Sequence, residues 1–385
     1  MDAAKSGKGS KRRTLTHPSI HSSRAVASDV ADTAEMVWLD ALEAEESGDR
    51  AGALDNATRV VEIDPTHVDG WMGVARWSLP PDSRGKQEMP ELPQAAKSMA
   101  ALRKVVELDP EPFDPWKLGG VLLVDHLGML EQGLAWWQER REFAPHEVAP
   151  LIEQIAILVR MGLYDECAAL LEQLYSEDLE TATGKQLDQM EAVNRMVSRA
   201  AKMEEDEIFR PQNPKHPRWK IIGNMKKRKP ISPTFFLITF IAPIVFIIGT
   251  AMMTLIGGTT WGFILVFLLI LASFMILTRM LSGILHKLNR HALDLDRAID
   301  YETTAGGVCI PEEIRYSKLY NAMISNRMPA LGERLELIVE SGDKMPMRWK
   351  PELPDFTISV SELTDSGDSE TEEWWGDSEL EPIED

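Results

Sequence analysis

Apolar residues are concentrated between Pro230 and Thr278, where no side chain carries a charge. A bilayer core about 30 Å thick is crossed by roughly 20 helical residues, and this block is long enough for two such helices. Between its two halves lies IGGTTWG (256–262), in which paired glycines favour a turn and a tryptophan suits the membrane interface. The pattern predicts a transmembrane hairpin at 232–282, with helices at 233–256 and 261–280.

The flanks of this block predict its orientation. Lys226–Lys229 precede the first helix, and three basic residues follow the second: Arg279, Lys287 and Arg290. Basic flanks stay in the cytoplasm, so we expect an integral membrane protein with both termini cytoplasmic, in a prokaryotic cell membrane. The uncharged turn and Pro243 leave an alternative, a hairpin that enters and leaves on one face without crossing.

Before the apolar block, the residues recur as paired amphipathic helices. VVEIDP (60–65), VVELDP (105–110) and REFAP (141–145) each end a helical pattern at a proline. Six residues after each proline comes a large apolar residue, in turn Trp71, Trp116 and Leu151. Small residues recur at matching positions in the first helix of each pair (Ala41, Ala75, Gly120) and in the second (Ala53, Gly133, Cys167).

These landmarks resemble the tetratricopeptide repeat (TPR), a helix–turn–helix unit of about 34 residues. The resemblance covers about 34–178 as four units: 34–65, 68–110, 113–145 and 148–178. Unit two is longer than the pattern, which predicts an insertion, SLPPDSRGKQEMPELP, between its helices. A helix near 184–206 is expected to cap the last unit, giving a solenoid at 34–208. An unrelated helical bundle is the alternative.

The predicted fold class is therefore all-α: a TPR-like helical solenoid, a transmembrane helical hairpin and short cytosolic helices. Around these we expect a basic disordered arm at 1–33, a basic linker at 209–231, a juxtamembrane helical region at 283–345 and an acidic disordered tail at 346–385. Two of the short helices are predicted at 311–324 and 329–340, each beginning at a proline.

An apolar stripe continues beyond the second membrane helix. Its members alternate four- and three-residue steps: Leu281, Leu285, Leu288, Ala292, Leu295 and Ile299. Such a heptad stripe packs either on the chain's own helices or on a second copy, as a homodimer through 281–299.

Charge and composition exclude several classes of function. The chain has 41 basic and 61 acidic residues, a formal net charge of −20, which argues against nucleic acid as a partner. Its two cysteines, Cys167 and Cys309, lie far apart, which argues against a zinc site or a disulfide framework. No glycine-rich phosphate loop or nucleophile elbow is present.

Two polar clusters contain residue types that can bind metals. His286 and His291 are five positions apart and would point to different sides of a helix, so we expect them to be solvated or to face headgroups. Asp294 and Asp296 likewise diverge, and we expect a solvated charged face. No catalytic residue, cofactor or metal is predicted, and the chain is not expected to be an enzyme.

The resemblance implies a protein-binding scaffold, here an adaptor held at the bilayer that binds a protein or peptide. The alternative is a non-enzymatic subunit of a transporter, translocase or pore in which the hairpin is the working part. In TPR proteins the first helix of each unit lines a concave groove. The matching positions are Met72, Arg76, Lys117, Val121, Ile152 and Ala156, with Arg160 one turn further.

This predicted groove combines apolar side chains with three cations, which suits an acidic peptide carrying aromatic residues. The chain's own tail, SETEEWWGDSELEPIED, has that composition, with Trp374 and Trp375 as candidate anchors. The alternative is that the cations are ordinary solvated charges and the tail binds another protein or nothing.

Overall fold

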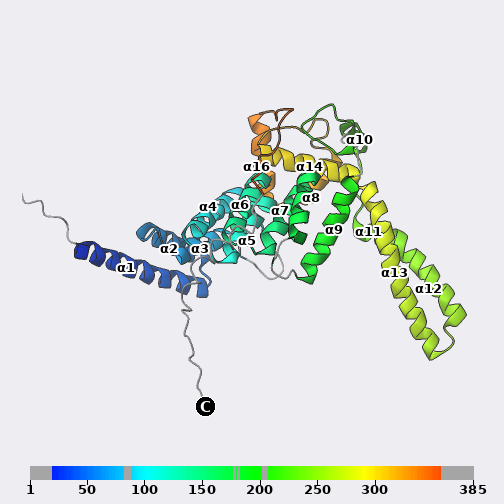
Figure 1. Cartoon of the computed structure of the whole chain (residues 1–385), viewed down its shortest axis with the longest axis horizontal. Helices are drawn as coiled ribbons and strands as arrows, with labels where there is room; N and C mark the ends of the chain where they lie inside the picture. The colour runs from blue at the N-terminus through cyan, green and yellow to red at the C-terminus, as the bar shows by residue number, and fades with distance from the viewer. Residues whose placement is uncertain (1–19, 82–87, 177–178, 180–182, 202–206, 357–385) are drawn as a thin grey trace, which may run out of the picture.

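The computed structural model describes residues 20–81, 88–176, 179, 183–201 and 207–356. Apart from one isolated bridge between Val308 and Lys344, the regular elements in this part of the chain are all helical. The predicted all-α fold class is confirmed. Helix pairs form a stack on one side of the molecule, and a long hairpin projects from the other end (Figure 1).

The solenoid consists of four helix pairs and a closing helix. They are α1 (Ile20–Glu46) with α2 (Arg50–Ile63), α3 (Val68–Ser78) with α4 (Leu92–Leu108), α5 (Phe113–Val121) and η1 (Leu122–His126) with α6 (Leu130–Phe143), α7 (Val148–Met161) with α8 (Tyr164–Ser176), and then α9 (Gly184–Ala200). Helix α1 begins inside the N-terminal arm that was expected to be disordered up to residue 33. Residues 1–19 lie outside the described part.

The spacing of prolines and tryptophans has a simple structural cause. The indole N–H of Trp71 donates to the carbonyl of Pro65 at 2.8 Å, and that of Trp116 donates to Pro110 at 2.9 Å. Each bond ties the start of a first helix to the residue that ended the previous unit. The six-residue interval in the sequence is thus the span of a recurring inter-unit turn.

Close helix packing depends on glycine in the third pair. A Cβ at Gly120 would lie 2.3 Å from a ring carbon of Trp137, and the neighbouring glycine faces Trp136 in the same way. The two indoles are buried against these glycines. Small residues therefore let α5 approach α6 closely, as helix packing requires.

The hairpin (residues 233–288) consists of α11 (Pro233–Phe236), η3 (Leu237–Ile241) and α12 (Ala242–Ile256), followed by α13 (Thr260–Leu288). Two helices, Pro233–Ile256 and Trp261–Leu288, are long and apolar enough to cross a membrane. The second is longer than the predicted 261–280. Thr259 caps it by accepting a hydrogen bond from the Gly262 N–H at 3.0 Å.

Residues 209–231, expected to be a linker, are instead part of a second core. Helix α10 (Pro217–Met225) packs on α14 (Arg290–Ala305), and the buried apolar residues of this core include Phe209, Trp219 and Ile222. The prolines and lysines that suggested a linker are interspersed with these anchors. Burial of the anchors stabilises the segment despite its composition.

The apolar stripe from 281 to 299 does not form one surface. Helix α13 ends at Leu288, and Asn289 separates it from α14. Ala292, Leu295 and Ile299 are 0–2% exposed because they pack on the chain's own helices. These three residues therefore pack within the chain, and the homodimer through 281–299 stays a prediction.

The first of the two short C-terminal helices begins later than predicted. Residues after Pro311 form turns, with Tyr316 at a positive φ of 65°, and α15 is Lys318–Ile324. Ser317 caps it by accepting a hydrogen bond from the Tyr320 N–H at 3.2 Å. Helix α16 (Pro329–Ser341) begins at Pro329, as the sequence suggested.

Helices α14 and α16 lie across the turns of the solenoid. Tyr301 on α14 donates from its hydroxyl to the Met161 carbonyl at 3.0 Å, and Arg334 on α16 donates to the Leu127 carbonyl at 2.7 Å. The main hydrophobic core accordingly includes Tyr301 and Ala330 together with the solenoid residues. The solenoid core therefore includes residues of α14 and α16, while other residues of these two helices belong to the second core.

Part of the expected disordered tail also packs on the solenoid. The Glu352 N–H donates to a carboxylate oxygen of Glu131 at 2.9 Å, and Gln173 donates to the Phe356 carbonyl at 3.0 Å. Residues 346–356 thus form an ordered strap. The rest of the tail, 357–385 with Trp374 and Trp375, lies outside the described residues.

Candidate functional site at the junction of solenoid and hairpin

The predicted groove residues lie on the first helices of three pairs, α3, α5 and α7. Arg76, Lys117, Val121 and Ala156 are exposed, and Met72 and Ile152 are half-buried. The exposed four are open to solvent, whereas Met72 and Ile152 pack partly against the core.

Two carboxylates that the sequence reasoning missed lie among them. Glu153 on α7 interacts electrostatically with Asp125 and Lys117. Burial raises the pKa of Glu153, Asp125 raises it further, and Lys117 opposes both. The cationic character of this face is therefore weaker than its arginines and lysines alone suggested. Residue spacing on α7 would have revealed Glu153, because it lies between the two groove positions of that helix.

Arg160 is not a free groove cation. Its guanidinium forms a two-pronged ion pair with Asp300 of α14, with both N–O distances 2.7 Å. It also donates to the carbonyl of Val124 at 3.3 Å and to the Asp125 carboxylate at 3.3 Å. This side chain fastens the end of α7 to α14 and so serves the junction, not the groove.

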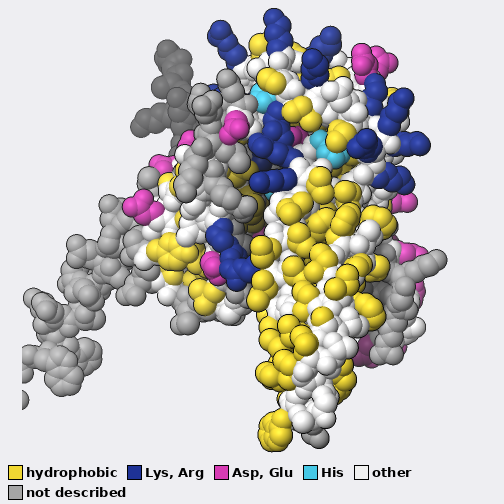
Figure 2. Space-filling model, turned by 90° about the vertical axis from the view of Figure 1, so that its right-hand side faces the viewer, with side chains coloured by type: hydrophobic (Ala, Val, Ile, Leu, Met, Phe, Trp, Pro, Cys, Tyr) yellow, Lys and Arg dark blue, Asp and Glu magenta, His cyan; other side chains and the backbone are white. Residues whose placement is uncertain are grey.

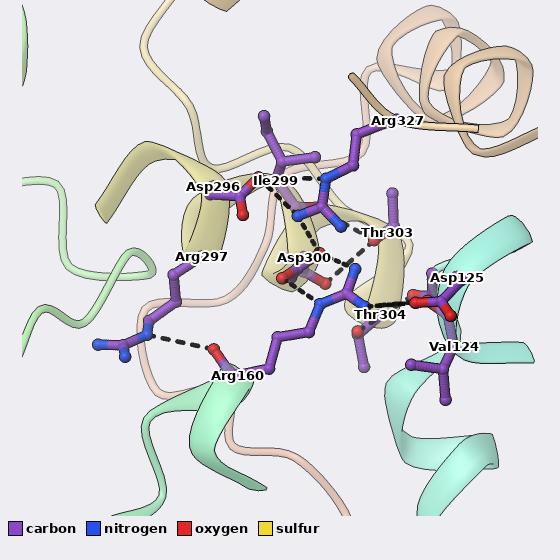
Figure 3. A network of polar contacts seen from close by, with 11 residues as sticks. Val124, Asp125, Arg160, Asp296, Arg297, Ile299, Asp300, Thr303, Thr304 and Arg327 are labelled. Atoms are coloured by element: carbon purple, nitrogen blue, oxygen red, sulfur yellow. Dashed lines mark hydrogen bonds and ion pairs between the residues drawn. The ribbon is translucent and has the colours of Figure 1, made fainter. Parts of the chain in front are cut away.

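Arg160 belongs to a larger polar network (Figure 3). Arg327, just before α16, donates to Asp300 at 2.8 Å and to Asp296 at 2.6 Å. The Asp300 carboxylate, 1% exposed, is thus held between two arginines that come from different parts of the chain. The network links α7 of the solenoid, α14 and the segment between α15 and α16.

The aspartates of α14 do not form a solvated charged face. Asp294 is buried and accepts a hydrogen bond from Arg218 of α10 at 2.6 Å. Burial raises the pKa of Asp294 and of Asp296, while Arg218 and Arg327 respectively oppose that rise. The expectation was wrong because the arginines that pair with these carboxylates lie far away in sequence.

Contrary to the expectation from the sequence, His291 is not solvated. It is 7% exposed, and burial holds its pKa below the usual value. His286 is exposed, as expected. Within the described residues, no group of three or more histidine, cysteine or acidic side chains is arranged to hold a metal.

A cavity of about 540 Å³ lies where α13 meets α14 and the end of the solenoid. Its lining combines apolar side chains of α13 and α14 (Met280, Ile284, Leu293) with basic ones (Lys287, Arg290, Arg297) and the aspartates of the network. The junction therefore contains the main polar network and a large amphipathic cavity beside the base of the hairpin.

Arg297 is held rigidly at this cavity. It donates to the Tyr164 hydroxyl at 2.9 Å and to the Arg160 carbonyl at 3.3 Å, and its guanidinium lies 5.7 Å from the centre of the Tyr164 ring. Gly162, which ends α7 at a φ of +78°, makes room for it, since a Cβ there would lie 2.6 Å from the guanidinium carbon. The glycine is needed both for the turn and for this contact.

The chain matches no protein-family model and no curated protein sequence. Among solved structures it is similar to the crystal structure of YrrB, described as a TPR protein with an unusual peptide-binding site. The match has 16% sequence identity and a TM-score of 0.29, and it covers 47% of this chain and 96% of YrrB.

Proposed function

We propose that this chain is a membrane-anchored scaffold, in which the hairpin sits in a bilayer and the solenoid binds a protein or peptide on the cytoplasmic side. The observation that carries the proposal is the exposure of large apolar side chains along the projecting hairpin. Phe246, Leu255 and Trp261 are 71%, 76% and 82% exposed. Apolar patches beyond a few hundred Å² are rare on soluble proteins, and a bilayer removes this surface from water.

The dimensions of the hairpin support the proposal. Its first helical stretch, Pro233–Ile256, has 24 residues, which at 1.5 Å per residue is about 36 Å and exceeds the bilayer core of about 30 Å. The side chain of Asn289 closes the base by bonding to both the N–H and the carbonyl of Ile231, at 2.9 Å and 2.8 Å. The two spans therefore start and finish at one level.

The charge distribution supports a cytoplasmic body. Basic side chains gather at the base of the apolar hairpin (Figure 2), and the sequence there contains Lys226–Lys229, Lys287 and Arg290. Basic flanks are retained on the cytoplasmic side of a membrane. The turn at Thr259 would then face the opposite side.

The polar groups of the spans give little support to the alternative of a transporter or pore subunit. Thr250, Thr254 and Ser273 each donate to a carbonyl of their own helix, at 2.7–3.0 Å. Intramembrane polar side chains that carry ions or substrates point instead into a bundle or a water-filled path. The hairpin fits an anchor better.

Within this proposal the partner surface is the exposed face of α3, α5 and α7. Its apolar members would hold hydrophobic side chains of an extended peptide, and Arg76 and Lys117 would hold acidic ones. Exposed pairs contribute only about 0.2–1 kcal/mol each, so most of the affinity must come from apolar anchors. The tail residues Trp374 and Trp375 are the anchors that this chain itself offers.

Cysteine labelling in intact cells tests the anchor. Thr259→Cys should react with a membrane-impermeant thiol reagent, whereas Ile20→Cys and Leu380→Cys should be protected. A reactive terminus would overturn the orientation, and protection of Thr259→Cys would favour a hairpin that does not cross. Release of the chain from membranes by alkaline carbonate would overturn the anchoring itself.

A peptide titration tests the groove. The peptide of residues 369–385 would be added to the full chain carrying Trp374→Ala and Trp375→Ala, so that the chain's own tail does not compete. Saturable binding that weakens with Lys117→Glu supports self-recognition. A peptide that does not bind at high micromolar concentration excludes it and leaves another protein as the partner.

A further inference from the structure

The cavity at the junction lies at the depth of the lipid headgroups, if the hairpin spans a bilayer as proposed. About 20 residues from Trp261 cross the core, which brings its boundary to Met280. Lys287 is two turns further, roughly 11 Å along the helix, and a lysine stem can reach back toward the membrane. The apolar part of the cavity thus borders the acyl region and its basic part borders the headgroups.

The apolar wall of the cavity continues onto the surface that faces the membrane. Met280 and Ile284 on α13 are 69% and 48% exposed, and Leu293 on α14 is 41% exposed. These residues also line the cavity, together with Met196 of α9. An acyl chain lying along α13 could therefore enter the cavity without crossing a polar barrier.

The basic part of the cavity carries an excess of positive charge. Each aspartate of the lining forms a salt bridge: Asp294 with Arg218, Asp296 with Arg327, and Asp300 with Arg160 and Arg327. Lys287, Arg290 and Arg297 form no salt bridge within the described part of the chain. Arg290 donates to the backbone carbonyl of Glu207 at 3.2 Å, and the Glu207 carboxylate is the unpaired acid of the described lining. Three cations therefore remain against one unpaired carboxylate, and Arg290 and Arg297 also lie near the paired Asp294.

We propose that this cavity binds one anionic phospholipid, with the headgroup phosphate on Lys287 and Arg290 and an acyl chain against Met280 and Ile284. Arg297, fixed by Tyr164, adds a third positive charge behind the phosphate. A lipid headgroup and a free phosphate ester offer the same charge to these cations, but the apolar wall beside the cations selects a lipid over a free phosphate in water. The space-filling view places basic side chains directly above the apolar hairpin (Figure 2).

The inference rests on the proposed membrane anchor, and the test separates the two. The full chain would be reconstituted into vesicles of phosphatidylcholine, with or without phosphatidylglycerol, and then extracted with mild detergent. Native mass spectrometry of the extracted protein would count the lipids retained. Failure to float with either type of vesicle would overturn the anchor, whereas insertion into both without preferential retention of phosphatidylglycerol would overturn the lipid site alone.

Two variants test the cavity against a diffuse surface charge. Lys287→Gln with Arg290→Gln should reduce retention of phosphatidylglycerol about fivefold per residue. The matched control, Lys227→Gln with Lys229→Gln, removes two charges from the same flank but not from the cavity. An equal loss in both pairs would show that the flank's general charge attracts the lipid, and it would refute a specific site.

A steric variant makes the test independent of charge. Gly283 lines the cavity, and a Cβ at this position would meet no atom within 4 Å. Gly283→Trp should therefore fill the space and displace the lipid without changing the net charge. Unchanged phosphatidylglycerol retention in this variant would refute the cavity as the site. Competition by glycerol phosphate in water as effective as by the lipid would refute the acyl-chain contact.

Discussion

Asp300→Asn tests whether the polar network holds the solenoid to α14. The amide keeps the shape of the side chain but loses the charge that both Arg160 and Arg327 face. Three guanidinium N–H groups, two of Arg160 and one of Arg327, donate to the Asp300 carboxylate, and at least one of them would meet an amide N–H instead of an oxygen. The guanidinium groups of Arg160 and Arg327 would then stay partly buried, with weaker hydrogen bonds to offset the loss of water.

The expected cost follows from the burial of the partners. Removing one side of a fully buried ion pair costs about 3–5 kcal/mol. Here the side chains of Arg160 and Arg327 keep 21% and 14% of their exposure, and Arg327 keeps its bond to Asp296. Solvent and the Asp296 carboxylate therefore limit the loss in the free energy of unfolding to about 2–3 kcal/mol.

The measurement is a thermal unfolding curve of the full chain in detergent, followed by tryptophan fluorescence. For a chain of this size, a loss of that magnitude corresponds to a midpoint lowered by about 3–5 °C. The matched control is Glu139→Gln, which breaks an exposed pair with Arg103 and should cost about 1 kcal/mol or less. If Asp300→Asn lowers the midpoint no more than Glu139→Gln does, the network does not fasten the two parts.

Three further predictions can be checked on the same protein. Gly120→Ala should lower the free energy of unfolding by about 1–3 kcal/mol, because the new methyl group overpacks against an indole. Gly332→Ala, with open space around its Cβ, should leave that free energy unchanged or raise it slightly. A lowered unfolding midpoint in both variants would contradict this. Because burial lowers the pKa of His291, its neutral form contributes stability that is lost as the pH falls below about 6.5, and His291→Gln should flatten the pH dependence of the midpoint. Cys167 and Cys309 are held as thiols, since burial raises the pKa of Cys167 to about 12 and that of Cys309 well above its usual value, so neither should react with a thiol reagent before unfolding.

The parts of the fold that the sequence predicts well depend on local patterns. The Pro65 to Trp71 interval predicts a turn within a few residues, and the uncharged block predicts two long apolar helices by length alone. Both signals involve residues that are close in the chain. Hydrophobic periodicity and turn chemistry therefore suffice to find these elements.

The parts that it predicts poorly depend on contacts between distant segments. Arg160 looked like a groove cation because its partner, Asp300, is 140 positions away. Residues 209–231 looked like a linker because proline and lysine are frequent there, while Trp219 and Ile222 pack in a core formed by residues after the hairpin. Pairing of that kind leaves no periodic trace in a single sequence.

The strap and helices that cover the solenoid turns lie after the hairpin in the chain, and this has a consequence for biosynthesis. The repeats leave the ribosome first, but the surface around Met161 is covered only when Tyr301 has been made. The hairpin is synthesised between these two events. The solenoid core is therefore completed only after the hairpin has been made, and the nascent repeats expose unfinished surface until the segment beyond the hairpin has folded back.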